Sequence, residues 1–298
     1  MIATDRRLES IGNFGPLAGF DNMLSKENER WWNLKSIAIK FIVWTLIVNV
    51  LVAASMYFIP MLISTDMKEK MANSSDELTR NMVISGKLDF TPDNVAGLGR
   101  SVFFSIAGFT MFIGAVIYAH DAILKERESG TAAWLLSKPV SRKAVVLSKI
   151  LGISFGMITI ILLVQGLITY LMCSFVQGRP LPLIPFFGGI GVLGIGLLFY
   201  LVLAMMLGAL SLSRVITLGV PIILNLMGTF ILSTIKGQGI IDLLGYLMPW
   251  NITGYATLIA AENPMALDHY WPWPIIATVF LIIVFVLVAV DRFERLEF

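Results

Sequence analysis

Charge is scarce in this chain of 298 residues. Asp, Glu, Lys and Arg together make up 14% of the sequence, whereas about 25% is usual for a soluble domain. The net charge of +2 gives no basic field for a nucleic-acid backbone. Cys173 is the single cysteine, so an internal disulfide is impossible. These shortages exclude a water-soluble enzyme, a disordered protein and a nucleic-acid binder. With 57% hydrophobic residues, the composition is that of a polytopic membrane protein.

Six apolar runs contain no Asp, Glu, Lys, Arg or His. A charge at the centre of a membrane helix costs about 2.5–3.5 kcal/mol on insertion scales, so this exclusion has a physical cause. Runs of about 18 residues cross a bilayer as helices, and an aromatic flank lengthens the shortest run. We predict an all-α polytopic membrane protein with six transmembrane helices at residues 41–63, 101–119, 150–176, 186–210, 215–235 and 274–290.

The basic residues set the orientation of these helices. Of the 22 Lys and Arg residues, 15 lie in the segments that share a side with the N-terminus, and 7 lie on the other side. Positive charge concentrates on the cytoplasmic side of membrane proteins. We therefore predict that both termini are cytoplasmic. Residues 1–40 form a cytoplasmic N-terminus, and residues 41–298 form the six-span domain.

An amphipathic helix is predicted ahead of the first span, at residues 20–35. Its apolar residues recur at helical spacing, which indicates a helix lying on the cytoplasmic membrane surface. The alternative is a plain membrane anchor without a partner. The residues assigned to the apolar face are Phe20, Met23, Leu24, Trp31 and Leu34.

The cytoplasmic loop 120–149 carries an apolar segment between charged flanks. The second membrane helix is expected to continue inward to Glu128, and a short helix follows at 131–137, with Thr131 as its cap and Pro139 at its end. Ser141 is the expected cap of the next helix. The short helix bears apolar residues that need burial, either against a cytoplasmic partner or against the protein's own helices: Trp134, Leu135 and Leu136.

On the outer side, the sequence predicts helix boundaries and two short helices. Thr91 followed by Pro92 is typical of a helix start, so the second membrane helix is expected to begin near Pro92. Segment 236–273 is apolar but interrupted by Pro249. It predicts two short helices in the outer leaflet before span six, one of them capped by Asn251.

Several enzyme motifs occur in the wrong context. Gly152-Ile153-Ser154-Phe155-Gly156 matches a nucleophile elbow, and 189–194 matches a dinucleotide fingerprint, but both lie inside predicted membrane helices. We interpret both as sites of close helix packing through small residues. The phosphate-binding loop is absent, because the only Gly-Lys pair, at Gly86, is followed by leucine. Two histidines on opposite predicted sides give no zinc site. We expect no enzyme activity and no cofactor in this chain.

Polar residues within the predicted spans are few. Asn49, Gln165 and Asn225 are candidates for lining a translocation pathway, although hydrogen bonding between helices is the commoner use of such residues. An ion-coupled transporter or an intramembrane enzyme needs charged or metal-binding groups inside the membrane. Their absence from the spans indicates that the energy for any transport comes from another chain.

Several segments of the chain resemble a known family, the permease subunits of ABC-2 type ABC transporters. That family has a Lys-Glu pair before span one, here Lys26-Glu27, and a charged, Gly-Thr, Leu-Leu-Ser, Pro and Ser-Arg motif between spans two and three, here at 126–142 with Lys149 following. The basic-acidic tail 291–295 is similar as well. The resemblance covers residues 20–298.

The resemblance implies the permease of an ATP-driven exporter, which forms the translocation pathway as a dimer with an identical or paralogous second permease. It implies that this dimer is bound to two cytoplasmic ATP-binding subunits that hold ATP and Mg²⁺, in a prokaryotic plasma membrane. It implies that residues 131–137 form a coupling helix. An alternative within the same architecture is a subunit that passes ATPase-driven motion to an outer-face partner without moving a substrate. The implied ATPase-coupling interface comprises Lys26, Glu27, Glu126, Arg127, Gly130, Thr131, Trp134, Leu135, Leu136, Pro139 and Arg142.

Overall fold

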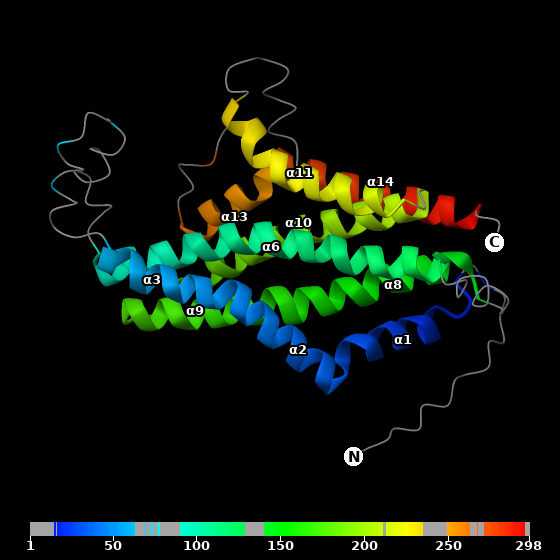
Figure 1. Ribbon diagram of the computed structural model, residues 1–298, viewed down its shortest axis with the longest axis horizontal. Coiled ribbons are helices and arrows are strands. Elements are labelled where there is room, and N and C mark those ends of the chain that lie inside the picture. The colour runs from blue at the N-terminus through cyan, green and yellow to red at the C-terminus, as the bar shows by residue number, and fades with distance from the viewer. Residues whose placement is uncertain are drawn as a thin grey trace.

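A computed structural model gives the fold of the chain (Figure 1). It describes residues 15, 17–62, 69, 73, 77, 90–128, 140–210, 213–234, 249–262, 267 and 271–295, without the side chains of 121, 123–128, 229–234 and 250. Every regular element in these ranges is a helix. The predicted all-helical class is therefore confirmed for this part of the chain.

Among the described residues, five helical rods are long and apolar enough to cross a membrane. Three of them are single α-helices: α6 (Pro92–Glu128), α10 (Leu183–Leu210) and α14 (Trp273–Glu294). The other two contain an inserted π-helical segment. The first rod consists of α2 (Leu34–Trp44), η1 (Thr45–Asn49) and α3 (Val50–Leu62), and the other of α8 (Arg142–Gly156), η2 (Met157–Leu163) and α9 (Val164–Gln177).

The remaining predicted span coincides with α11 (Arg214–Thr234). Its stretch Arg214–Gly228 is apolar but shorter than the five spans, so the sixth span stays a prediction. Two short elements precede α14, namely η3 (Pro249–Asn251) and α13 (Ile252–Ala260), close to the position predicted for a short outer helix. Asn251 is the N-cap residue of α13, but its side chain makes no capping hydrogen bond.

The long helices run side by side, and α10 lies at the centre of their packing (Figure 1). Tyr200 of α10 stacks on Phe112 of α6 with ring centroids 4.9 Å apart. A Cβ placed at Gly189 would lie 2.6 Å from the backbone oxygen of Ala256 in α13. The 189–194 motif lies within a continuous helix, α10. Its first glycine therefore serves close helix packing, as predicted.

The predicted ends of α6 agree with the structure. The helix begins at Pro92, where the Asn94 N–H donates to Thr91 Oγ1 at 3.3 Å, and it continues to Glu128 as predicted. Ser141 is the N-cap residue of α8, although its side chain makes no capping hydrogen bond.

The N-terminal helices depart from the prediction. The first helix, α1 (Phe20–Trp32), ends at Asn33, whose extended backbone breaks it from α2 and whose side chain caps α2 by accepting the Lys35 N–H at 3.0 Å. The membrane rod therefore begins at Leu34 rather than at residue 41. The assignment of Leu34 to the apolar face of the first helix was wrong, because Leu34 opens the next helix and is 85% exposed.

Candidate functional site

Helix α1 sits in a groove of α8 that is formed by two glycines. Glu27 and Trp31, one helical turn apart, face this groove and are buried. A Cβ placed at Gly152 would lie 2.7 Å from the Glu27 Cβ, and one at Gly156 would overlap the Trp31 ring. The Trp31 ring also contacts Tyr118 of α6, with centroids 5.1 Å apart. The segment 152–156 is thus a packing surface, as predicted, and its partner is α1.

An ion pair lies within the α1–α8 contact. Lys149 Nζ donates to Glu27 Oε1 at 2.8 Å, and the two residues are only 2% and 4% exposed. The second carboxylate oxygen, Oε2, is buried and has no hydrogen-bond partner among the residues that the structure describes. Removing one member of a buried pair leaves an uncompensated charge and typically costs about 3–5 kcal/mol. The pair therefore ties the position of Glu27 on α1 to that of Lys149 on α8.

The first turn of α8 connects three segments of the chain at the predicted cytoplasmic end. The Ser141 N–H donates to the Ala18 oxygen at 3.0 Å, just ahead of α1. Arg142 Nη1 donates to the Glu294 oxygen at 2.8 Å, at the end of α14. Lys143 forms a partly exposed ion pair with the Glu294 carboxylate at 3.5 Å. Movement of this turn would therefore be transmitted to the segment just ahead of α1 and to the end of α14.

A second polar contact, further along the α8–η2–α9 rod, joins it to the α2–η1–α3 rod. Asn49 Nδ2 and Thr45 Oγ1 donate to Gln165 Oε1 at 2.6 and 3.0 Å. Thr169 Oγ1 donates to Asn49 Oδ1 at 2.7 Å. Asn49, Gln165 and Thr169 are buried, and within the described ranges the Gln165 Nε2 has no hydrogen-bond partner. Both rods carry their π-helical segment at or beside this cluster, and π-helical segments are frequent at functional sites.

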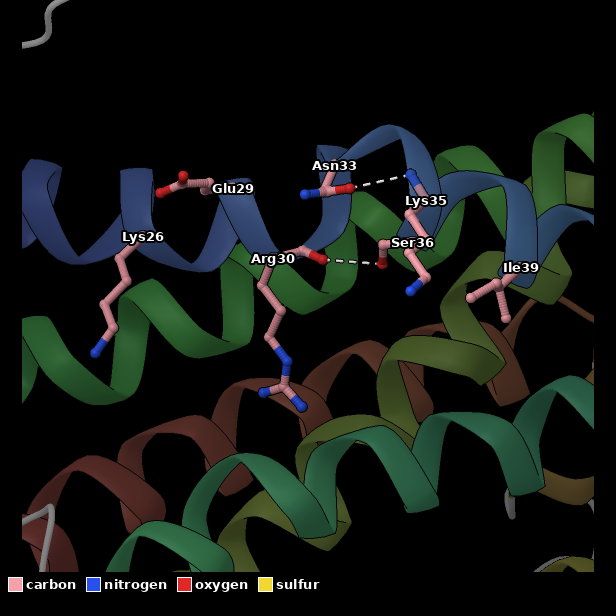
Figure 2. Close-up of a pocket in the computed structure, with 7 residues that line it drawn as sticks. All are labelled: Lys26, Glu29, Arg30, Asn33, Lys35, Ser36 and Ile39. Carbon is pink, nitrogen blue, oxygen red and sulfur yellow. Dashed lines mark hydrogen bonds between the residues drawn. The ribbon is translucent and has the colours of Figure 1, made fainter.

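The structure brings only some of the predicted residues together. Asn225 lies away from the Asn49–Gln165 contact and donates to the Phe109 oxygen of α6 at 3.2 Å. Lys26 lies on the exposed side of α1, where it lines a pocket (Figure 2). Glu126 and Arg127 belong to the last turn of α6. The remaining predicted coupling residues lie outside the described residues: Gly130, Thr131, Trp134, Leu135, Leu136 and Pro139.

Three residues of this site did not figure among the predicted functional residues. Lys149 was recognised only as part of a motif, and Gly152 and Gly156 only as packing residues without a known partner. The signal in the sequence is their spacing, because Lys149 is three residues before Gly152 and lies one helical turn from it. Within the described residues, no cluster of three or more His, Cys, Asp or Glu is placed to hold a metal ion.

Comparison with known proteins decides the family. Residues 40–297 match the sequence profile of the family described as ABC-2 family transporter protein. The chain belongs to this family. It is an ABC-2 permease, the membrane-spanning part of an ABC transporter, as the resemblance of its motifs indicated.

One curated relative supports the same assignment. The permease is 38% identical over 96 residues to the probable ABC transporter permease protein NosY of Stutzerimonas stutzeri. The alignment covers 28% of this chain and 33% of that relative. The chain therefore matches about a third of the relative's length, and the similarity is regional.

Proposed function

We propose that this permease is the membrane subunit of an ATP-driven exporter that works as a dimer with two cytoplasmic ATP-binding subunits. Membership of the ABC-2 family implies an ABC ATPase partner. ATP and Mg²⁺ would be bound by that partner, and the permease would supply the translocation pathway. Both termini would face the cytoplasm of a prokaryotic cell, with α11 as the sixth span. At a rise of 1.5 Å per residue, its 21 residues extend about 32 Å, which is close to the hydrocarbon thickness.

The observation that carries this proposal is the buried Glu27–Lys149 ion pair in the α1–α8 contact. The resemblance of the 126–142 motif implies a coupling helix at 131–137, ahead of α8 in the sequence. An ATPase that presses on this segment, or on α1, would move the base of α8. Because α8, η2 and α9 form one rod, the displacement would travel along the third span. Through the Glu27–Lys149 pair, α1 would move together with the base of α8.

The two polar contacts define what would move together. Glu27–Lys149 joins the N-terminal helix to the base of the third span, and Asn49–Gln165 joins the first and third spans further along. The π-helical segment η2 lies between these two contacts on the third span. We expect the first and third spans to tilt as a unit, with the π-helical segments as the places where the rods bend.

Co-purification tests the central part of this proposal. The tagged permease is purified from its native membrane in mild detergent, and its partners are identified by mass spectrometry. We expect a stoichiometric ATPase subunit with a phosphate-binding loop and a mass of roughly 25–35 kDa, within the usual range of domain sizes. Addition of ATP and Mg²⁺ should then give hydrolysis in the complex. A permease that is fully folded and carries no ATPase would overturn the coupling mechanism.

A further inference from the structure

A pocket of about 550 Å³ occupies the elbow between α1 and α2 (Figure 2). Its lining is mainly cationic and polar. Lys26 and Arg30 come from α1, and Lys35 comes from the first turn of α2. Glu29 is the one acidic residue among the lining residues. The pocket is largely open to its surroundings, and the charge balance of its lining favours an anion.

The cations of the elbow are held near one another by helix geometry. Lys26 and Arg30 are one helical turn apart and extend from one side of α1, whereas Glu29 extends from the other side (Figure 2). Ser36 Oγ donates to the Arg30 backbone oxygen at 3.0 Å, which ties α2 to the end of α1. Within the described part of the chain, Lys26, Arg30 and Lys35 form no ion pair with a carboxylate.

An exposed apolar stripe runs from this pocket along the membrane rod. Lys35, Ile39, Ile42 and Leu46 follow one another at intervals of four, three and four residues, so they share one face of the helix. The three apolar side chains are 53%, 55% and 59% exposed. Ile39 also lines the pocket. The cationic pocket and the apolar stripe are therefore continuous.

We propose that this elbow is a binding site for an anionic phospholipid. The headgroup phosphate would lie among Arg30, Lys35 and Lys26, and an acyl chain would lie along Ile39, Ile42 and Leu46. Basic pockets beside membrane helices on the cytoplasmic side are suited to anionic headgroups. A soluble anion would satisfy the cations and leave the stripe unused, whereas a phospholipid matches both parts. The proposal requires that the chain spans a membrane and does not depend on ATPase coupling.

The position of the elbow gives such a lipid a structural effect. Arg30 and Trp31 are neighbours in α1, and Trp31 packs at Gly156. A headgroup bound between α1 and α2 would hold the elbow at one angle, and so would stabilise α1 in its α8 groove. The lipid would thus act on the same helix whose movement the ATPase is proposed to drive.

Native mass spectrometry of the purified permease tests this site. Phosphatidylglycerol and phosphatidylcholine with identical acyl chains are titrated into the protein in neutral detergent. The pocket variant is Arg30→Gln/Lys35→Gln, and the matched control is Arg292→Gln/Arg295→Gln, which removes two cations at the same predicted membrane face. We expect preferential retention of phosphatidylglycerol by the wild type and the control, and binding weaker by about tenfold in the pocket variant. Arg30→Lys/Lys35→Arg should retain the preference.

Four outcomes would overturn the lipid site. The first is equal retention of both lipids by the wild type, and the second is unchanged phosphatidylglycerol binding in a folded pocket variant. The third is displacement of the lipid by inorganic phosphate at comparable concentration, which would assign the pocket to a free anion. A pocket variant that loses the co-purifying ATPase and keeps the lipid would assign the surface to the protein partner and would also overturn it. None of these outcomes bears on whether the wild-type permease co-purifies with an ATPase, so the lipid site and the proposed function can fail independently.

Discussion

Glu27 and Lys149, which are 122 residues apart in the sequence, form a buried ion pair 2.8 Å long between α1 and α8. Burial removes both charges from water, and their attraction offsets that cost only while both partners are present. The pair also links two motifs that the family carries separately, the Lys-Glu pair before span one and the lysine after the 126–142 motif. Glu27 and Lys149 therefore belong to one structural unit at the predicted cytoplasmic face.

The Glu27–Lys149 pair should show strong coupling between its members. Glu27→Ala leaves Lys149 buried and unpaired, so we expect a loss of about 3–5 kcal/mol and a clearly lower apparent Tm in detergent. The double variant Glu27→Leu/Lys149→Met replaces both charges with apolar groups of similar size and should recover most of that loss. Scanning fluorimetry of the purified variants measures the Tm. A double variant no more stable than Glu27→Ala would contradict the pairing.

The glycine groove of α8 should not accept larger residues. Gly156→Val places side-chain atoms where the Trp31 ring lies, and Gly152→Val does the same against Glu27. We expect α1 to be displaced, which a protease cleavage assay on the N-terminal segment would detect as faster cutting. Gly97→Val is the matched control, because a Cβ at Gly97 meets nothing within 4 Å. Equal protection of all three variants would show that α1 does not depend on the groove.

Local signals predicted much of the fold. The absence of charge located the five apolar rods, although three of them begin seven to nine residues before the predicted spans. The Thr91-Pro92 cap gave the start of α6, because capping chemistry is encoded by neighbouring residues. The break at Asn33 was missed, because the apolar spacing continued through it and Leu34 fitted the periodic pattern. Ending a helix there depends on the backbone of a single residue, which periodicity does not detect.

The functional site was harder to predict than the spans. Glu27 lies between Met23 and Trp31 on the buried face of α1, where a carboxylate is unexpected unless it has a partner. Its partner is a lysine from a distant segment, and nothing in the local pattern of either residue specifies the other. Gly152 and Gly156 were identified as packing residues, but a single sequence does not indicate which helix fills the groove they form.

The Asn49–Gln165 contact should behave as a unit that excludes Asn225. Asn49→Ala and Gln165→Ala each break the same hydrogen bond, so a double-mutant cycle on unfolding stability should give a coupling energy of about 0.5–2 kcal/mol. The matched cycle uses Asn49→Ala with Asn225→Ala, whose partner is the Phe109 oxygen on α6, and should be additive within about 0.5 kcal/mol. Additivity in both cycles would remove the cluster as a link between the first and third spans.

The predicted coupling helix gives the sharpest test of the ATPase mechanism. Trp134→Asp/Leu135→Asp places two charges on the apolar segment of the 120–149 loop, where a docking surface would have to desolvate them. We expect the ATPase to be lost from the purified complex, while the amount of permease in the membrane stays unchanged. The conservative variant Trp134→Phe/Leu135→Met keeps the surface apolar and should retain the partner. If the acidic variant retains its ATPase in full, the docking contact lies elsewhere, and α1 with its buried ion pair becomes the remaining candidate for receiving the ATPase movement.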